Sequence, residues 1–202
     1  IDIRKELLEL DELHMYDLYT PIIKDIDKTI TYDEAWDTII QALSPLGDEY
    51  LDLLKQARSN RWIDIYENKG KRSGAYSWGA YGTHPYVLLN YNNNLNSMCT
   101  LAHEMGHAIH THYSNTNQPY IYAGYTIFVA EVASTVNEAI LIRYLLQNAT
   151  DKNEKAYLIN YFLEQFRGTL YRQTMFAEFE AKIHNEYEKT KALTVDSISG
   201  IY

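Results

Sequence analysis

Apolar residues recur at three- and four-residue steps from Leu95 to Ile109, which is the spacing of one face of an α-helix. A run of three asparagines, 92–94, comes just before them, and asparagine is a favoured residue at the start of a helix. The pattern predicts a helix over 94–113. Gly106 lies inside it and costs about 1 kcal/mol relative to alanine, so we expect a close backbone approach at that position.

Four further stretches of the chain have the same helical period. The first is predicted over 31–43. Ser44-Pro45 ends it and begins a second helix that continues to about Ala57. Two longer helices are predicted over 126–149 and 153–190. Helices therefore account for most of the predicted secondary structure.

The segment 68–94 differs from these helices, because it contains four glycines and four tyrosines at regular steps. Glycine-rich turns between short aromatic runs indicate a small β-region. We predict strands over 72–78 and 86–91. The first 30 residues indicate an extended or irregular approach, and 114–125 is predicted to be a loop.

These elements together predict a mostly α-helical fold with a small β-sheet beside the helix at 94–113. We expect a single region over 1–202. It divides into a helical lead-in at 1–60, a small β-region at 61–93 and a group of helices at 94–202. We expect these last helices to bind a metal.

Composition narrows the possible partners. The chain is 46% hydrophobic, as expected of a globular protein, and its 27 acidic residues exceed its 18 basic ones to give a formal net charge of -9. The longest basic cluster is the short segment 69–72, so nucleic acid is not an expected partner. No apolar run approaches the roughly 20 residues of a membrane-spanning helix, and no charged-then-apolar leader opens the chain. We therefore expect no membrane association and a cytoplasmic location.

Cysteine usage agrees with that location. Cys99 is the single cysteine, which excludes an internal disulfide and is typical of a reducing compartment. The chain begins at Ile1 without a methionine and stops at Tyr202 with no evident terminating pattern. We expect it to be a fragment of a longer protein.

The predicted helix at 94–113 carries the candidate chemistry. His103 and His107 lie four residues apart on it, and four steps of about 100° bring them to within about 40° of one face. Both imidazoles can therefore reach one ion. Glu104 lies beside this pair, at the position of a general base for a metal-bound water. The alternative is a chance match to this short motif on an amphipathic helix.

A third metal ligand is needed, because catalytic zinc generally takes three protein ligands and leaves one position to water. His110 cannot complete the set with His103, since seven residues give a rise of about 10.5 Å along a helix and Zn–N bonds are about 2 Å long. The metzincin pattern would need a histidine six residues after His107, where this chain has Tyr113. The third ligand is therefore expected from another helix.

Glu131 is the best candidate, 24 residues after His107 (131 − 107) in an apolar, small-residue run. A charge in such a setting is costly to bury unless it is paired or bound to a metal, so we assign Glu131 as the third ligand. Glu138 is the second candidate, and otherwise it orients a ligand histidine or is an ordinary helical acid. His110 is predicted to lie beside the ligands rather than among them.

Four motifs, in order, carry a resemblance to a known family: Gly70–Tyr76, Thr100–His110, the segment around Glu131, and Phe166–Glu180. Over most of residues 60–190 the chain resembles the oligoendopeptidase F group of the thimet oligopeptidase-like zinc metallopeptidases. The resemblance implies a zincin-like, gluzincin catalytic core with one Zn²⁺ per chain. In that core His103, His107 and Glu131 hold the zinc and Glu104 is the base.

Members of this family are much longer than the present chain and cleave short peptides. The resemblance therefore implies a zinc metalloendopeptidase whose partners are short peptide substrates and the missing remainder of the same enzyme. In the expected reaction, Glu104 takes a proton from the zinc-bound water that attacks the peptide carbonyl. The substrate backbone is predicted to add to the sheet edge at Gly74, Ala75 and Tyr76.

Two alternatives stay open. The chain could bind a metal without catalysing hydrolysis. It could also be a di-iron carboxylate protein, in which a Glu-x-x-His motif recurs on two helices. Glu104–His107 supplies one copy, and the sequence has no second.

Overall fold

The computed structural model describes residues 2–23 and 28–202. These divide into two compact units, one formed by 28–154 and the other by 2–23 together with 155–202. The described chain is mostly helical with one small sheet, as the apolar pattern predicts.

The first unit begins with two helices in the predicted places. Helix α2 (Tyr32–Ala42) starts at Thr31, whose hydroxyl accepts from the Glu34 backbone N–H while the Glu34 carboxylate accepts from the Thr31 N–H. This reciprocal pair satisfies two backbone donors at the helix start. The short 3-10 turn η2 (Ser44–Leu46) then separates α2 from α3 (Asp48–Ser59).

The sheet has three short strands, β1 (Ile63–Asp64), β2 (Tyr76–Trp78) and β3 (Tyr86–Leu88), in the order β1-β3-β2. β1 pairs with β3 in parallel, and β2 pairs with β3 antiparallel. β2 therefore forms one edge of the sheet. Both β2 and β3 pack against helix α4, so the sheet lies beside that helix as expected.

The strand predictions over 72–78 and 86–91 were too long, and β1 was not predicted. Gly74 has a φ of 88°, which L side chains rarely adopt, so the extended run before Tyr76 is interrupted. The Asn90 side-chain amide donates to the backbone carbonyls of Arg72 and Gly74. A side chain rather than a neighbouring strand therefore holds this segment.

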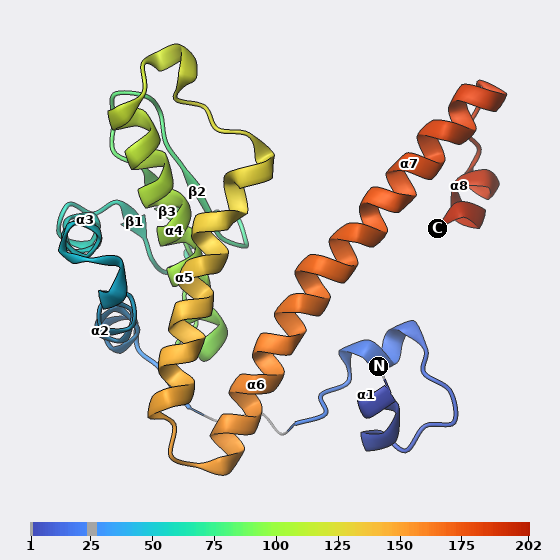
Figure 1. The fold of residues 1–202 in the computed structure, drawn as a ribbon, viewed down its shortest axis with the longest axis horizontal. Coiled ribbons are helices and arrows are strands. Elements are labelled where there is room, and N and C mark those ends of the chain that lie inside the picture. The colour runs from blue at the N-terminus through green and yellow to red at the C-terminus, as the bar shows by residue number, and fades with distance from the viewer. Residues whose placement is uncertain (1, 24–27) are drawn as a thin grey trace. The chain divides into compact units, whose positions relative to one another are not determined.

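Helices α4 (Leu95–Asn117) and α5 (Ile127–Asn148) form the centre of this unit and run side by side (Figure 1). Their contact depends on Gly106, because a Cβ added there would lie 2.6 Å from Ser134 Cα and 2.8 Å from the Ala133 carbonyl oxygen. The expected close backbone approach is confirmed, and its partner is the backbone of α5. The buried face of α4 fills the core with apolar side chains: Met98, Cys99, Leu101, Ala102, Met105, Ala108 and Ile109.

Helix α4 is longer than predicted, so the expected loop over 114–125 was wrong at its start. The Thr116 hydroxyl donates to the His112 carbonyl at 2.8 Å, and the Asn117 amide donates to the Tyr113 carbonyl at 2.9 Å. These polar side chains satisfy carbonyls of the preceding turn, and the helix continues to Asn117. The 3-10 turn η3 (Tyr120–Tyr122) shapes the remaining connection.

One long helical run, most of it in the second unit, agrees with the prediction for 153–190. It consists of α6 (Lys152–Phe166), the π-helical segment η4 (Arg167–Tyr171) and α7 (Arg172–Thr190). The π-helical segment is a departure from the predicted regular helix. A short further helix, α8 (Val195–Ile201), follows and was not predicted.

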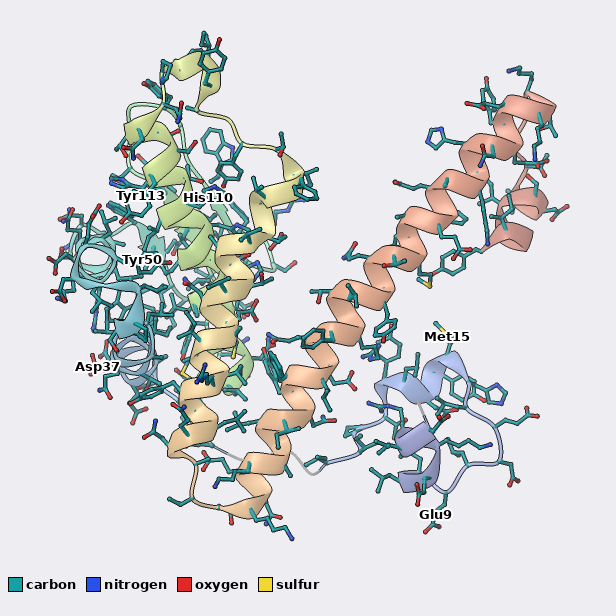
Figure 2. The ribbon with its side chains drawn as sticks, in the orientation of Figure 1. Glu9, Met15, Asp37, Tyr50, His110 and Tyr113 are labelled. Carbon is teal, nitrogen blue, oxygen red and sulfur yellow. The ribbon has the colours of Figure 1, made fainter. Side chains whose placement is uncertain are left out.

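The first 30 residues are less irregular than expected. Residues Asp2–Leu7 form helix α1, and Met15–Tyr19 form the 3-10 turn η1 (Figure 2 labels Met15). The buried Arg4 guanidinium holds this segment, because it pairs with the Glu164 carboxylate at 2.6 Å and also donates to the Thr20 carbonyl. The part of this prediction that falls on residues 1 and 24–27 lies outside the described residues.

Across residues 2–23 and 28–202, none of the helices combines the length and the apolar character needed to cross a membrane.

The contact at Gly106 makes a testable prediction. We expect Gly106→Ala to lower the free energy of unfolding by about 1–3 kcal/mol, the usual cost of overpacking, despite a gain of about 1 kcal/mol in helix propensity. Urea denaturation measures the change. Gly168→Ala is the matched control, because a Cβ there meets no atom within 4 Å, and it should be neutral or stabilising. A Gly106→Ala variant as stable as the parent would contradict the proposed packing constraint.

Candidate metal centre

Three side chains of the first unit meet at one point. Helix α4 places His103 and His107 one turn apart with their Nε2 atoms 3.1 Å from each other. From α5, Glu131 Oε2 lies 3.3 Å from each of these nitrogens. Among the residues that the structure describes, this is the one group of three or more His, Cys, Asp or Glu that could hold a metal ion.

The dimensions of this triangle fit a zinc ion. Two ligands about 2.0–2.1 Å from a tetrahedral zinc lie about 3.3–3.4 Å apart, close to the observed 3.1–3.3 Å. A neutral imidazole has one ring nitrogen with a free lone pair, and an ionised carboxylate can only accept. Three atoms with free lone pairs in close contact are a ligand set that a divalent cation would bind.

Helix α5 also orients the two histidine rings through hydrogen bonds outside the triangle. The Glu138 carboxylate accepts from His103 Nδ1 at 2.6 Å, which leaves the Nε2 lone pair directed at the triangle. His107 has a backbone hydrogen bond with Ala130. α5 therefore supplies both the third side chain of the triangle and the groups that fix the rings.

The predicted roles of the two acids can be compared with their positions. Glu131 Oε2 is one corner of the triangle, whereas Glu138 contacts Nδ1 of His103, which is not part of it. This arrangement favours Glu131 over Glu138 as a third ligand.

Glu104 is only 7% exposed, although the side chains of His103 and His107 on the same helix are more exposed. Its carboxylate accepts a hydrogen bond from the Ser77 backbone N–H on the edge strand β2. Burial raises the pKa of Glu104, and the charges of Glu131 and Glu138 raise it further, while His103 opposes them. The result is a carboxyl group beside the triangle that takes up a proton more readily than an ordinary glutamate.

The two histidines have pKa values shifted in opposite directions. Burial acts to lower the pKa of His103, but the hydrogen bond that His103 donates to Glu138 and the surrounding carboxylate charges outweigh it, so the pKa is raised. Burial lowers the pKa of His107 despite the nearby Glu131. The pair is therefore asymmetric, because only His103 has a carboxylate on its second nitrogen.

His110 lies beside this group rather than in it, toward the C-terminal part of α4 (Figure 2). Its ring stacks on Tyr125 with centroids 3.9 Å apart, and the Tyr125 hydroxyl is bonded to Thr111. His110 Nδ1 is buried and has no hydrogen-bond partner among the described residues, and burial lowers its pKa. These contacts attach the loop before α5 to the helix that carries the histidines.

The candidate substrate residues lie on the sheet side of α4. Gly74 and Ala75 line a cavity of about 430 Å³ that also borders Asn96 and Thr100, and Thr100 lies one turn before His103. Tyr76 begins the edge strand β2 and is half exposed. The Gly74 carbonyl already accepts from Asn90, so it is partly occupied.

Sequence reasoning missed several groups that support this site. Ser77 acts through its backbone, and Ala130 does the same, so their residue types carry no signal. Ser134 is a buried hydroxyl that donates to Glu131 Oε2 at 2.8 Å, and its three-residue spacing from Glu131 was an available signal. Asn137 joins α5 to the Ala102 carbonyl of α4, which periodicity alone does not reveal.

A His-Glu-x-x-His helix closed by a carboxylate from a neighbouring helix is the arrangement of a metal-dependent hydrolase. A sequence comparison assigns the chain to a family. A sequence model described as Peptidase family M3 matches residues 2–202. The chain therefore belongs to peptidase family M3.

Individual relatives agree with this family and with the resemblance to oligoendopeptidase F. Oligopeptidase PepF of Bacillus subtilis (strain 168) is 54% identical over 202 residues, which cover all of this chain and 30% of the relative. The chromosomal oligoendopeptidase F of Lactococcus lactis subsp. cremoris is 45% identical over all of this chain and 33% of the relative. The chain thus spans about a third of the length of the relatives it matches.

Solved structures have the same fold. The crystal structure of oligoendopeptidase-F from Enterococcus faecium superposes with a TM-score of 0.60 at 34% identity, covering 99% of this chain and 28% of that one. A solved protein from Chlamydophila abortus reaches a TM-score of 0.82 at 44% identity, covering all of this chain and 34% of that one.

The environment of Glu104 makes a prediction about pH. Its pKa is raised above the ordinary 4.5 in the folded protein, so the folded state loses stability as the pH rises above 4.5, and the full loss is reached above the folded-state pKa. We expect Glu104→Gln to increase the melting temperature of the metal-free protein at pH 7. The increase should shrink toward pH 4, where Glu104 is protonated.

Glu34→Gln is a control of opposite sign. Hydrogen bonds from Thr31 lower the pKa of Glu34, so its contribution to stability is present above pH 4.5 and is lost as the pH falls through the lowered folded-state value. This substitution should decrease the melting temperature at pH 7. The quantity to compare is the melting temperature of Glu104→Gln minus that of the parent. A smaller difference at pH 7 than at pH 4 would contradict the assignment of a raised pKa.

Proposed function

We propose that this chain is the core of the catalytic half of a zinc metalloendopeptidase of the gluzincin, zincin-like type that hydrolyses short peptides. One observation carries the proposal: two imidazole Nε2 atoms and one carboxylate oxygen lie 3.1–3.3 Å from one another, at the spacing of ligands on a tetrahedral zinc. His103, His107 and Glu131 would hold one Zn²⁺. Membership of family M3 supports peptide hydrolysis as the reaction.

Each residue of the site then has a task. A zinc ion bound there would supply Lewis acidity, which lowers the pKa of water and polarises a peptide carbonyl. Glu104 accepts the proton of the attacking water on its carboxylate and returns it to the leaving amine. The Ser77 N–H keeps that carboxylate beside the triangle, and its raised pKa suits a group that must both accept and release a proton.

Peptide substrates would be held by main-chain pairing. β2 is an edge strand, and an extended peptide can add to such an edge. We assign this role to the backbone of Gly74, Ala75 and Tyr76, which leads into β2 and lies near the cavity one turn before His103. Small residues at the first two positions allow a substrate backbone to approach closely.

The remainder of a longer peptidase would be the partner of this chain, because its relatives are about three times as long. A chain that binds zinc without hydrolysing peptides is the alternative that this length favours. A di-iron site is less well supported, since the described residues contain one candidate cluster with a single Glu-x-x-His. The cytoplasmic location and the exclusion of nucleic acid stay predictions.

Metal binding tests the first part of this proposal. We expect the purified chain to bind one zinc, measured by elemental analysis and by competition with a chromophoric chelator. His103→Ala, His107→Ala and Glu131→Ala should each weaken zinc binding steeply and leave only the residual affinity of two ligands, because each removes one of three ligands. Glu138→Gln should weaken binding by about 10- to 100-fold, as usual for a group that orients a ligand histidine. His184→Ala, on α7 in the other unit, is the control and should bind normally.

Two results would overturn the ligand assignment. One is the presence of two irons per chain in place of one zinc. The other is full zinc binding by Glu131→Ala together with complete loss in a Glu138→Ala variant, which would exchange the roles of the two acids.

Hydrolysis tests the role of Glu104. We expect Glu104→Gln to retain zinc and to lower kcat for a fluorogenic short peptide by about 10²- to 10⁴-fold, the usual contribution of a general base. Equal kcat in the parent and the variant would exclude Glu104 as the base. Zinc binding without cleavage by the parent chain would favour the inactive alternative, and the same pair of proteins would then be compared within a full-length relative.

A further inference from the structure

Ser134 is a buried hydroxyl with an unusual position in this site. It lies on α5 one turn after Glu131 and is fully buried. Its Oγ is 2.8 Å from Glu131 Oε2 and 3.1 Å from the Glu131 backbone carbonyl oxygen. Oε2 is also the atom that lies 3.3 Å from both histidine nitrogens.

We propose that Ser134 is a positioning residue that holds the ligand oxygen of Glu131 in place for the metal. This inference rests on the zinc site proposed above. Ser134 itself does not bind the ion or the substrate. It acts by donating a hydrogen bond to one lone pair of Oε2, which leaves another lone pair of the same oxygen directed at the two imidazoles.

The need for such a group follows from the exposure of Glu131. Its side chain is 61% exposed, whereas those of His103 and His107 are 26% and 17% exposed. A long, exposed glutamate side chain samples many rotamers, and only some of them bring Oε2 to the histidines. The histidines are fixed by packing and by their second nitrogens, so Glu131 is the least restrained member of the triangle without Ser134.

Ser134 is in turn fixed by the contact between the helices. The Cβ position of Gly106 falls 2.6 Å from Ser134 Cα and 2.8 Å from the Ser134 backbone nitrogen. The serine backbone therefore lies directly against α4 at Gly106, and Gly106 stands between His103 and His107 in sequence. The contact between Gly106 and Ser134, together with the hydrogen bond from Ser134, thus fixes Oε2 relative to the histidines. The exposed part of the Glu131 side chain does not fix it.

The neighbouring Thr135 provides a matched comparison. Its hydroxyl donates to the backbone carbonyl of the same Glu131, but no hydrogen bond joins it to the carboxylate in the described structure. Thr135 is exposed. Removing its hydroxyl takes away a hydrogen bond to the same backbone carbonyl without removing any bond to the Glu131 carboxylate.

The experiment compares Ser134→Ala with Thr135→Ala. We expect Ser134→Ala to weaken zinc binding about 10-fold or more, within the range for groups that orient ligands, measured by chelator competition. The cobalt-substituted protein should show a changed visible d–d spectrum, since Glu131 is less well placed. Thr135→Ala should leave both the affinity and the spectrum unchanged. The melting temperature of each metal-free variant reports any change in folding.

A double-mutant cycle keeps the inference falsifiable if Ser134→Ala also affects folding. In a Glu131→Ala background, Ser134→Ala should have no further effect on the residual zinc affinity. An equal loss in the presence and absence of Glu131 would overturn the proposal, as would wild-type affinity and spectrum in Ser134→Ala. Failure of the parent chain to bind zinc would instead overturn the proposed function, which distinguishes the two outcomes.

Discussion

The close contact between α4 and α5 at Gly106 is the constraint on which the rest of the site depends. A side chain as small as a methyl group would meet the backbone of α5 at 2.6 Å, so the two helices can reach this separation only at a glycine. The two histidines lie on either side of Gly106 in sequence. The acids that face them come from the part of α5 that this contact brings nearest, which is why one packing feature sets several polar distances together.

The same contact concentrates charge. Glu104, Glu131 and Glu138 surround two imidazoles, and their mutual repulsion adds to burial in raising the pKa of Glu104. Such a group of acids opposes folding when it is ionised without a counter-charge. A divalent cation in the triangle would reverse the sign of these interactions. Stability and the proposed chemistry therefore make opposite demands on these positions, as they often do at functional sites.

Periodicity and spacing predicted the parts of this arrangement that depend on local sequence. The helices around residues 31–59 and 94–148 follow from repeating apolar positions, and the four-residue spacing of His103 and His107 predicted that they share one face. Glu131 was chosen because a buried acid is costly, but its side chain is 61% exposed, so it reaches the histidines without being buried. The strand β1 could not be found in this way, because it consists of two residues paired with a distant strand. The hydrogen bond from Ser77 to Glu104 could not be predicted for a related reason, since its donor is a backbone N–H that almost any residue would offer. In each case the structure depends on a contact with a residue far away in the sequence, which local patterns do not identify.

Asn137 extends the constraint from two helices to three. Its amide donates to the Ala102 carbonyl at 3.0 Å, and its own carbonyl accepts from the Tyr50 hydroxyl of α3 at 3.0 Å. Burial raises the pKa of Tyr50 to about 12, so this hydroxyl remains a proton donor throughout the neutral range. Because a backbone carbonyl has two lone pairs, Ala102 can accept from Asn137 and still keep its helical bond. The turn that begins at His103 is therefore held from outside α4 by a link that does not titrate, while the acids beside it do.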